Sequence, residues 1–313
     1  MRRLELALAG AGGEAVDFRA TIASHGLGWL APNRLDLAGA PCALETTLDL
    51  GADEGRFVRL TCETAGRLAI DIAGPRLASG SRDAVIRQVR AMLALDLDLS
   101  AFHARAARDP KLAWTARGVG RMLRSPSAFE DVARTLCTTN CTWGGTTRMI
   151  AALVAELGTP ARGAPGRRAF PGAPAIAECD DRVLRDVARL GYRAPFLRAI
   201  AREVANGALD LEALRDAPPE ALPDAELDAR LRALPGFGPY AAAHTMMLFG
   251  RRSRLVLDSW TRPTYARLVR RKHVADDVIE RRFRKTYGED AGLAFWLFLW
   301  RERHESEAPP SLA

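Results

Sequence analysis

Lysine is nearly absent from this sequence of 313 residues. Lys111, Lys272 and Lys285 are the only three, while lysine and arginine together number 45, so arginine carries almost all of the positive charge. The formal net charge of +7 suits a polyanionic partner, because each phosphate that a protein neutralises releases counterions. A coding bias toward arginine explains the same composition, so charge alone does not decide between the two.

Cysteines and long apolar runs are also scarce. The cysteines number five, an odd and scattered set that argues against a disulfide framework. Cys137 and Cys141 are followed by no Cys or His pair at metal-ligand spacing, so we expect no metal site. No apolar stretch reaches the roughly 18–20 residues that span a bilayer, and the first residues do not form an apolar signal core. We therefore expect no membrane association and a cytoplasmic protein, associated with the nucleoid if it is bacterial.

Residues 1–78 contain short runs in which apolar and polar side chains alternate. Alternation with a period of two indicates strands with one buried face, and the Gly- and Asp-rich breaks between the runs are typical of an antiparallel meander. We predict a small antiparallel sheet domain over residues 1–78, with strands at 3–8, 16–22, 43–50, 56–62 and 67–73.

The pattern changes to helical spacing from about residue 79, with Ser81 as a candidate N-cap. A Pro/Gly/Arg-rich loop is expected at 160–174. Strands followed by helices define an α+β chain, here with a two-lobed all-helical region over residues 79–313. Beyond the first helix, which starts near Ser81, the expected helices lie at 99–108, 113–123, 128–137, 146–157, 180–190, 194–207, 211–216, 224–233, 240–249, 259–270, 276–287 and 289–302.

The most informative stretch is residues 234–242, LPGFGPYAA, which joins two helical patterns by a very short turn. Gly236 and Gly238 permit a tight turn and close approach of another backbone. Pro239 stands at the first position of the next helix, where its missing N–H costs nothing. Free amides at a helix N-terminus form an anion site, so we expect Gly236, Phe237 and Gly238 to bind phosphate. The whole hairpin is expected at about residues 224–249.

A second signal lies twenty residues beyond Gly238, where the aliphatic run 255–257 leads into Asp258 at the expected start of a helix. Arg262 falls on the first turn of that helix. A carboxylate in this position is a candidate for catalysis. The competing interpretation is a helix N-cap, and one aspartate can serve as both, because a cap fixes the direction of the carboxylate.

Together these two segments resemble the helix–hairpin–helix DNA glycosylase superfamily. In that superfamily the catalytic Asp follows an apolar run at this distance, and an Arg commonly follows four positions later. The resemblance implies that Asp258 is catalytic, that the hairpin holds DNA backbone and that a damaged base is flipped from the duplex. The chain has Ser259-Trp260-Thr261 where many members carry a small residue, His and an aliphatic residue, which puts Trp260 at the expected pocket wall.

The scarcity of lysine now matters, because members that also nick the strand carry a Lys just after the hairpin. Tyr240 occupies that position here, so the resemblance implies a monofunctional enzyme that leaves an abasic site. The position is aromatic in the alkylpurine branch, which makes Tyr240 and His244 candidates for the base pocket; the alternative is that both only pack. Cys179 is the last cysteine, so no iron–sulfur cluster and no other cofactor is expected, although the hairpin is compatible with a monovalent cation.

Two further segments resemble 8-oxoguanine glycosylases. Residues 136–143, LCTTNCTW, resemble the segment whose Asn fills the hole left by the flipped base, a role that Asn140 would take here; otherwise Asn140 is a turn residue. Residues 190–194, LGYRA, resemble a helix junction of the same branch. The last helix is expected to lend Phe295 and Leu299 to the base pocket, the alternative being that its aromatic residues are core.

The sequence therefore favours a monofunctional base-excision-repair glycosylase for an alkylated purine such as 3-methyladenine. An 8-oxoguanine-type glycosylase is the alternative substrate class. A non-catalytic helix–hairpin–helix DNA-binding module is the alternative of another kind. The expected partner is double-stranded DNA that contains a damaged base, and we expect a monomer.

Overall fold

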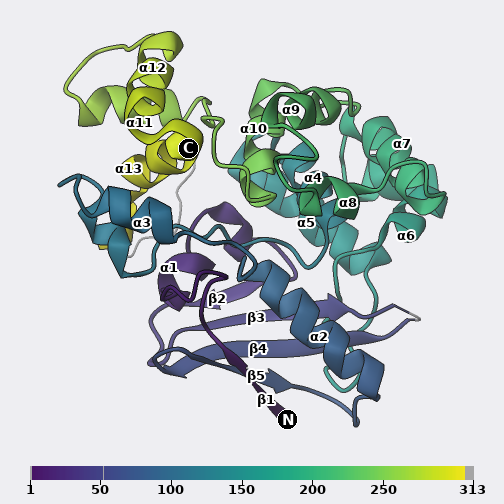
Figure 1. Cartoon of the computed structure of the whole chain (residues 1–313). Helices are drawn as coiled ribbons and strands as arrows, with labels where there is room; N and C mark the ends of the chain where they lie inside the picture. The colour runs from purple at the N-terminus through teal and green to yellow at the C-terminus, as the bar shows by residue number, and fades with distance from the viewer. Residues whose placement is uncertain (1, 52, 307–313) are drawn as a thin grey trace.

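The computed structural model describes residues 2–51 and 53–306. The last part of the expected helical region, residues 307–313, lies outside the described residues. An N-terminal sheet is followed by helices, which confirms the α+β fold class (Figure 1). The sheet lies beneath two groups of helices, with α11–α13 in one group and α4–α10 in the other (Figure 1).

The sheet has five strands in the order β1-β5-β4-β3-β2, and every neighbouring pair is antiparallel. Four of the five predicted strands are confirmed, whereas β2 was not predicted because three residues give no periodicity. One face of the sheet packs against Val85, Val89 and Met92 of helix α2 (Ser79–Met92). The strands are β1 (Arg2–Ala7), β2 (Arg34–Asp36), β3 (Ala43–Asp49), β4 (Gly55–Thr64) and β5 (Arg67–Ile72).

The strand predicted at residues 16–22 is wrong, because this segment forms helix α1 (Phe18–Ile22). Asp17 caps the helix: its Oδ1 accepts from the N–H of Ala20 at 2.8 Å. The hydroxyl of Thr21 donates to the carbonyl of Asp17 at 2.8 Å. A run of seven residues is too short to distinguish the two-residue period of a strand from the 3.6-residue period of a helix. The capping contacts, rather than the alternation of side chains, therefore determine the conformation.

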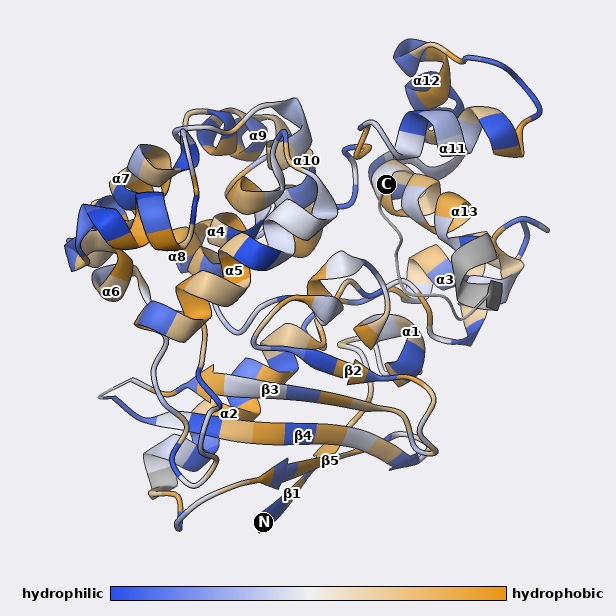
Figure 2. Ribbon diagram, turned by 180° about the vertical axis from the view of Figure 1, so that it is seen from behind, coloured by the Kyte–Doolittle hydropathy of each residue, from blue (hydrophilic) through white to orange (hydrophobic). Residues whose placement is uncertain are grey.

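Most of the predicted helices are confirmed, and the short helix α6 was not predicted. Figure 2 shows α13 largely in hydrophobic colours, as its run of buried residues requires. The helices after α2 are α3 (Ser100–Ala106), α4 (Ala128–Thr138), α5 (Trp143–Leu157), α6 (Ala173–Glu178), α7 (Arg193–Ala205), α8 (Leu211–Asp216), α9 (Asp224–Arg232), α10 (Pro239–Leu248), α11 (Thr261–Leu268), α12 (Asp276–Tyr287) and α13 (Ala291–Ser306).

Of two helices expected from the sequence, one is replaced by a single turn and the other is shortened. In place of a helix at 113–123 there is a 3₁₀ turn at Ala113–Arg117, which ends because Gly118 and Gly120 have φ values of 109° and 132°. The helix expected at 180–190 is present but shorter: residues 181–187 are helical, with a π-helix at Val183–Val187. Ser81 is also not the N-cap of α2; it lies inside the helix and donates to Glu54 at 2.9 Å.

The helices form two hydrophobic cores that meet near Asp258, which confirms the two-lobed arrangement. One core is built mainly from α4–α10 and the other from α3 and α11–α13. Val256 is buried in the first core, whereas Leu255 is buried in the second. Trp260 packs against both. The run 255–257 therefore follows the boundary between the lobes, and Asp258 comes directly after it.

Candidate active site and nucleic-acid interface

The hairpin begins with α9, turns at residues 233–238 and continues as α10. Leu234 and Phe237 are both buried, which fixes the turn in the first core. Gly236 has a φ of 80°, and a Cβ there would lie 2.7 Å from Phe196 and 2.8 Å from Leu136. Only glycine therefore fits at position 236 without strain.

Gly238 has the opposite character. Its backbone is extended, with φ −106° and ψ −172°, and a Cβ there would meet no atom of the described chain within 4 Å. It is the N-cap of α10, no side chain caps the helix, and Pro239 occupies the first turn. The first intrahelical bond runs from the N–H of Ala242 to Gly238 at 3.0 Å. The amides of Tyr240 and Ala241 thus lack intrahelical partners, and the positive end of the helix dipole faces open space. The N–H of Phe237, expected to bind phosphate, donates instead to the carbonyl of Leu234 at 3.1 Å.

Asp258 is held at the start of α11 by its own backbone. Its Oδ1 accepts from the N–H of Trp260 at 2.8 Å and from that of Thr261 at 2.7 Å. In return, the N–H of Asp258 donates to the hydroxyl of Thr261 at 2.7 Å. This reciprocal pattern is a helix cap, and it leaves the direction of the carboxylate fixed.

A cavity of about 480 Å³ brings the hairpin and this aspartate together. We call it the Asp258 cavity. Pro239 and Tyr240 line it from the start of α10, Asp258 and Trp260 from the start of α11, and Asn140 from the end of α4. A space of this size matches the pockets that hold small molecules in proteins.

Tyr240 and His244 form a stack at one wall of the cavity. Their rings are nearly parallel, at 8°, with centroids 6.0 Å apart. The hydroxyl of Tyr240 lies 3.2 Å from that of Thr138, and Nδ1 of His244 lies 3.3 Å from the hydroxyl of Thr135. Tyr240 lines the cavity, whereas His244 is buried behind it, so the structure brings only the first of the two to the cavity surface.

Burial is the largest cause of the pKa shifts of both side chains in this stack. It raises the pKa of Tyr240 to about 12 and lowers the pKa of His244 to about 4. His25 contacts His244 edge-on, with centroids 5.6 Å apart, and burial lowers the pKa of His25 to about 3. Both histidines are therefore neutral at physiological pH, and neither is a cation beside the cavity.

Asn140 stands at the rim of the cavity in a left-handed conformation, with φ 45°. Its amide donates to the hydroxyl of Tyr192 at 3.3 Å, and the Tyr192 ring is 49% exposed. The buried Arg193 donates from Nε to the carbonyl of Thr139 and from Nη2 to that of Asn140, both at 3.1 Å. The segment 190–194 therefore fixes the loop that carries Asn140.

Trp260 lies against two tryptophans of α13. Its ring centroid is 5.7 Å from that of Trp296 and 6.1 Å from that of Trp300. The structure does not bring Phe295 and Leu299 to the cavity. They are 0% and 1% exposed in the second core, where Phe295 contacts Tyr265 and Phe283. Because α13 is apolar on all sides, its sequence pattern cannot show which face meets the cavity.

Several lining residues were not singled out as pocket residues from the sequence. Trp143 and Cys141 line the cavity beside Asn140, and their place in the same segment was the one available signal. Arg262, noted for its spacing from Asp258, also lines it and makes a two-point ion pair with Asp276, at 2.9 Å for each bond. No lysine is among the residues that line this cavity.

Neither a helix that could span a membrane nor a cluster of metal-ligating side chains is found in the described part of the chain. Within residues 2–51 and 53–306, no helix combines the length and apolar character that crossing a bilayer requires. The same residues contain no group of three or more His, Cys, Asp or Glu side chains placed to hold one metal ion.

Comparison with known proteins identifies the fold. No protein-family model matches this chain. No curated protein matches it either. Solved structures do match, and three of them are described next.

Three of these structures match along nearly the whole chain. The 3-methyladenine DNA glycosylase of Archaeoglobus fulgidus has a TM-score of 0.74 at 20% identity, covering 96% of this chain and 99% of its own. MBOgg1, in complex with a low-affinity DNA ligand, has a TM-score of 0.71 at 18% identity, covering 98% and 97%. The Clostridium acetobutylicum 8-oxoguanine glycosylase/lyase, in complex with DNA containing cytosine opposite 8-oxoguanine, has a TM-score of 0.68 at 18% identity, covering 94% of each chain. The chain thus has the fold of the helix–hairpin–helix DNA glycosylases.

Proposed function

We propose that this protein is a DNA glycosylase of base-excision repair, which binds double-stranded DNA and hydrolyses the bond between a damaged base and its sugar. The observation that carries the proposal is that one cavity is lined both by Asp258 and by the first residues of α10, at the mouth of the hairpin. A phosphate held by the hairpin amides would place the next nucleotide at the opening of the Asp258 cavity.

The reaction needs a fixed anion beside the sugar. Breaking the bond between C1′ and the base nitrogen develops positive charge on the sugar, as in glycoside hydrolysis. The carboxylate of Asp258 is held by two backbone N–H groups on Oδ1, so it need not reorganise as that charge develops. It can also orient the water whose oxygen bonds to C1′ and accept a proton from it. The products are the free base and an abasic site.

We propose that the enzyme is monofunctional. Strand cleavage through a Schiff base requires an amine that attacks C1′, and the lining of the Asp258 cavity supplies a phenol, Tyr240, at the position after the hairpin. Burial raises the pKa of that phenol to about 12, so it is neutral at working pH. Such a side chain supports the base or its sugar and forms no covalent bond with it.

Within this function we favour an alkylated purine as substrate. The cavity wall is aromatic, with Trp143, Tyr240 and Trp260, and a cationic base stacks well on electron-rich rings. A cationic base also leaves as a neutral molecule, so its departure needs no proton from a general acid. The neutral His244 behind Tyr240 is consistent with such a substrate. We expect the chemistry to need no cofactor; a monovalent cation at the hairpin stays a prediction.

The second candidate substrate is oxidised guanine. Its support is the resemblance of residues 136–143 and 190–194 to segments of 8-oxoguanine glycosylases. Asn140, from the first segment, lies at the rim of the cavity and contacts Tyr192 of the second. Its amide can donate to and accept from the base left unpaired after flipping. That role does not depend on the damaged base, so Asn140 fits both substrates.

The test is a panel of duplexes, each with one alkylated purine, one 8-oxoguanine or no lesion, incubated with the protein and divided. One half is treated with hot alkali, which cleaves at abasic sites. We expect cleavage of the alkylated duplex only after alkali. Cleavage without alkali would contradict a monofunctional enzyme, and cleavage of the 8-oxoguanine duplex alone would favour the second substrate. Binding with no product from any duplex would favour a non-catalytic DNA-binding module.

A further inference from the structure

A second, larger cavity of about 680 Å³ opens between α2, α8 and the loop that follows α10. Its lining is rich in arginine, and we call it the arginine cavity. Six arginines and two aspartates line it, but four of the arginines are neutralised by ion pairs, so the excess positive charge belongs to Arg87 and Arg90. The carboxylates of these pairs are those of Asp96, Glu212, Asp216, Asp224 and Asp290. The arginines are Arg87, Arg90, Arg124, Arg215, Arg251 and Arg252.

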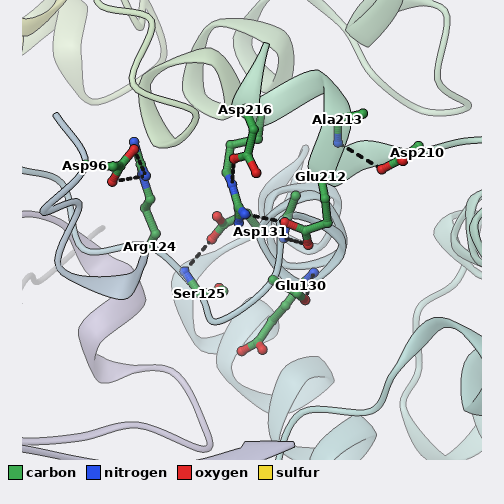
Figure 3. A network of polar contacts seen from close by, with 12 residues as sticks. Asp96, Arg124, Ser125, Glu130, Asp131, Asp210, Glu212, Ala213 and Asp216 are labelled. Carbon is green, nitrogen blue, oxygen red and sulfur yellow. Dashed lines mark hydrogen bonds and ion pairs between the residues drawn. The ribbon is translucent and has the colours of Figure 1, made fainter. Parts of the chain in front are cut away.

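Two of these arginines keep N–H groups without partners. Arg124 is 3% exposed and binds both oxygens of Asp96 at 2.9 and 3.0 Å, while Arg215 binds Asp216 at 2.9 Å (Figure 3 shows Arg124 with Asp96). Yet Nη2 of Arg124 and Nη1 of Arg215 are buried and have no hydrogen-bond partner among the described residues. A buried donor without a partner costs about 1–3 kcal/mol, so an acceptor oxygen brought to it is stabilised.

The backbone beside Arg124 is shaped around its guanidinium. Gly250 has a φ of 83°, and a Cβ there would lie 2.9 Å from Nη2 of Arg124. A side chain at this position would displace the guanidinium. The glycine therefore keeps Arg124 at the cavity wall with Nη2 unpaired.

Arg87 and Arg90 add exposed positive charge to the cavity lining. They are three residues apart on α2, on the same face of the helix, and both are exposed. Neither has an ion-pair partner within the part of the chain that the structure describes. Two unneutralised guanidiniums at the entrance attract an anion and can bind its oxygens in two-point contacts.

The rest of the wall is apolar, with Leu97, Pro218, Pro219 and Phe249. A cavity with arginines on some sides and apolar side chains on others fits a ligand that combines phosphate with a flat organic part. The volume lies within the range of about 300–1,000 Å³ that small-ligand pockets occupy. These properties together describe a nucleotide.

The arginine cavity is separate from the Asp258 cavity. The first residues of α10, Pro239 and Tyr240, line the Asp258 cavity, whereas Phe249, Gly250 and Arg251, just past its last turn, line the arginine cavity. The helix has ten residues, which at 1.5 Å per residue separates its two ends by about 15 Å. A nucleotide bound at one end is therefore not the base being excised at the other.

We propose that the arginine cavity binds nucleotide phosphate, either of a free nucleotide or of a DNA strand that passes the side of the protein away from the hairpin. Arg87 and Arg90 hold the phosphate at the entrance, and Arg124 and Arg215 supply further donors. This inference goes beyond the proposed glycosylase function and does not depend on it.

The test is isothermal titration calorimetry of the full chain with ADP at low salt. The variant Arg87→Ala/Arg90→Ala removes two exposed guanidiniums and leaves the buried pairs intact. The matched control is Arg82→Ala, an exposed arginine of the same helix that does not line the cavity. We expect the double variant to weaken ADP binding at least roughly tenfold, and the control to match the parent.

An undamaged duplex, added to the ADP complex, distinguishes the two sources of phosphate. Displacement of ADP by the duplex, with a duplex affinity that falls in the double variant, identifies a DNA strand as the occupant. ADP binding that the duplex does not disturb identifies a free nucleotide. The proposal is overturned if the double variant binds ADP and duplex as tightly as the parent does, or if the parent binds neither. It is also overturned if Arg82→Ala weakens binding as much as the double variant does. Base excision is scored separately, so its presence or absence does not affect this result.

Discussion

The open position at Gly238 allows stability and DNA binding to be changed in opposite directions. We consider Gly238→Asp. The backbone there is extended, which any residue adopts, and a Cβ would meet no described atom within 4 Å. Asp is a preferred N-cap, and its carboxylate would accept from the amides of the first turn of α10.

The expected magnitudes follow from this geometry. Capping should raise the free energy of unfolding by a few tenths of a kcal/mol, and in no case lower it by more than about 0.5 kcal/mol. The same carboxylate occupies the amides that would hold phosphate and repels the phosphate itself. Loss of one hydrogen bond to a charged group corresponds to about 1.5–3 kcal/mol, or roughly 10- to 150-fold in Kd.

The assay is fluorescence anisotropy with a duplex that carries a stable abasic-site analogue, and with an undamaged duplex, at fixed salt. Both affinities should fall alike, because the hairpin contacts backbone rather than bases. Gly80→Asp is the matched control: it adds the same charge near the N-terminus of α2, and a Cβ there also meets no described atom within 4 Å.

Gly236→Ala provides the opposite comparison. At a φ of 80°, with a Cβ 2.7 Å from Phe196, it should lower the free energy of unfolding by about 2–5 kcal/mol. Undiminished affinity of Gly238→Asp for both duplexes, with stability equal to the parent, would show that the hairpin does not hold phosphate.

Three further predictions concern the surroundings of the cavity. Burial lowers the pKa of His25 to about 3 and of His244 to about 4, so both bind protons more weakly folded than unfolded. The stability that comes from keeping them neutral is fully present above pH 6.5 and is lost as the pH falls toward 4 and 3. The free energy of unfolding, measured with urea, should therefore fall by about 2 kcal/mol per histidine between pH 7.5 and 5, and by correspondingly less in His244→Gln. A variant with the same pH dependence as the parent would refute the assignment. Phe295→Ala should lower the free energy of unfolding by about 3–5 kcal/mol as a core truncation; lost excision at unchanged stability would instead give Phe295 a role in the site. Cys141 is exposed in the cavity, so maleimide should label it and an abasic-site duplex should protect it; equal labelling rates with and without duplex would place DNA elsewhere.

The parts of the site that the sequence could predict are those with local signals. Gly236 reveals the hairpin because its positive φ requires glycine, and Gly238 does so because a residue without a side chain leaves the start of α10 uncapped. The run before Asp258 is similarly local, and the two backbone bonds to its Oδ1 follow from its place at a helix start. Here the caps and the turn alone decide the conformation.

What the sequence could not predict depends on contacts between distant residues. The apolar helix α13 buries Phe295 and Leu299 and turns Trp296 toward Trp260, a choice that its pattern does not encode. Trp143, at the start of α5, reaches the cavity because α4 packs against both α5 and α10. The arginine cavity joins residues as distant as 87 and 252, so no local motif announces it.

The most direct test of the account is the single-turnover excision rate of Asp258→Asn on the preferred lesion duplex. The asparagine oxygen can still accept from Trp260 and Thr261, so the local structure is kept while the charge is lost. Asp276→Asn is the control, since Asp276 pairs with Arg262 but does not line the cavity. We expect Asp258→Asn to slow excision about 10²- to 10³-fold while Asp276→Asn stays near the parental rate. Equal rates for parent and Asp258→Asn would contradict the central claim that this carboxylate drives base removal.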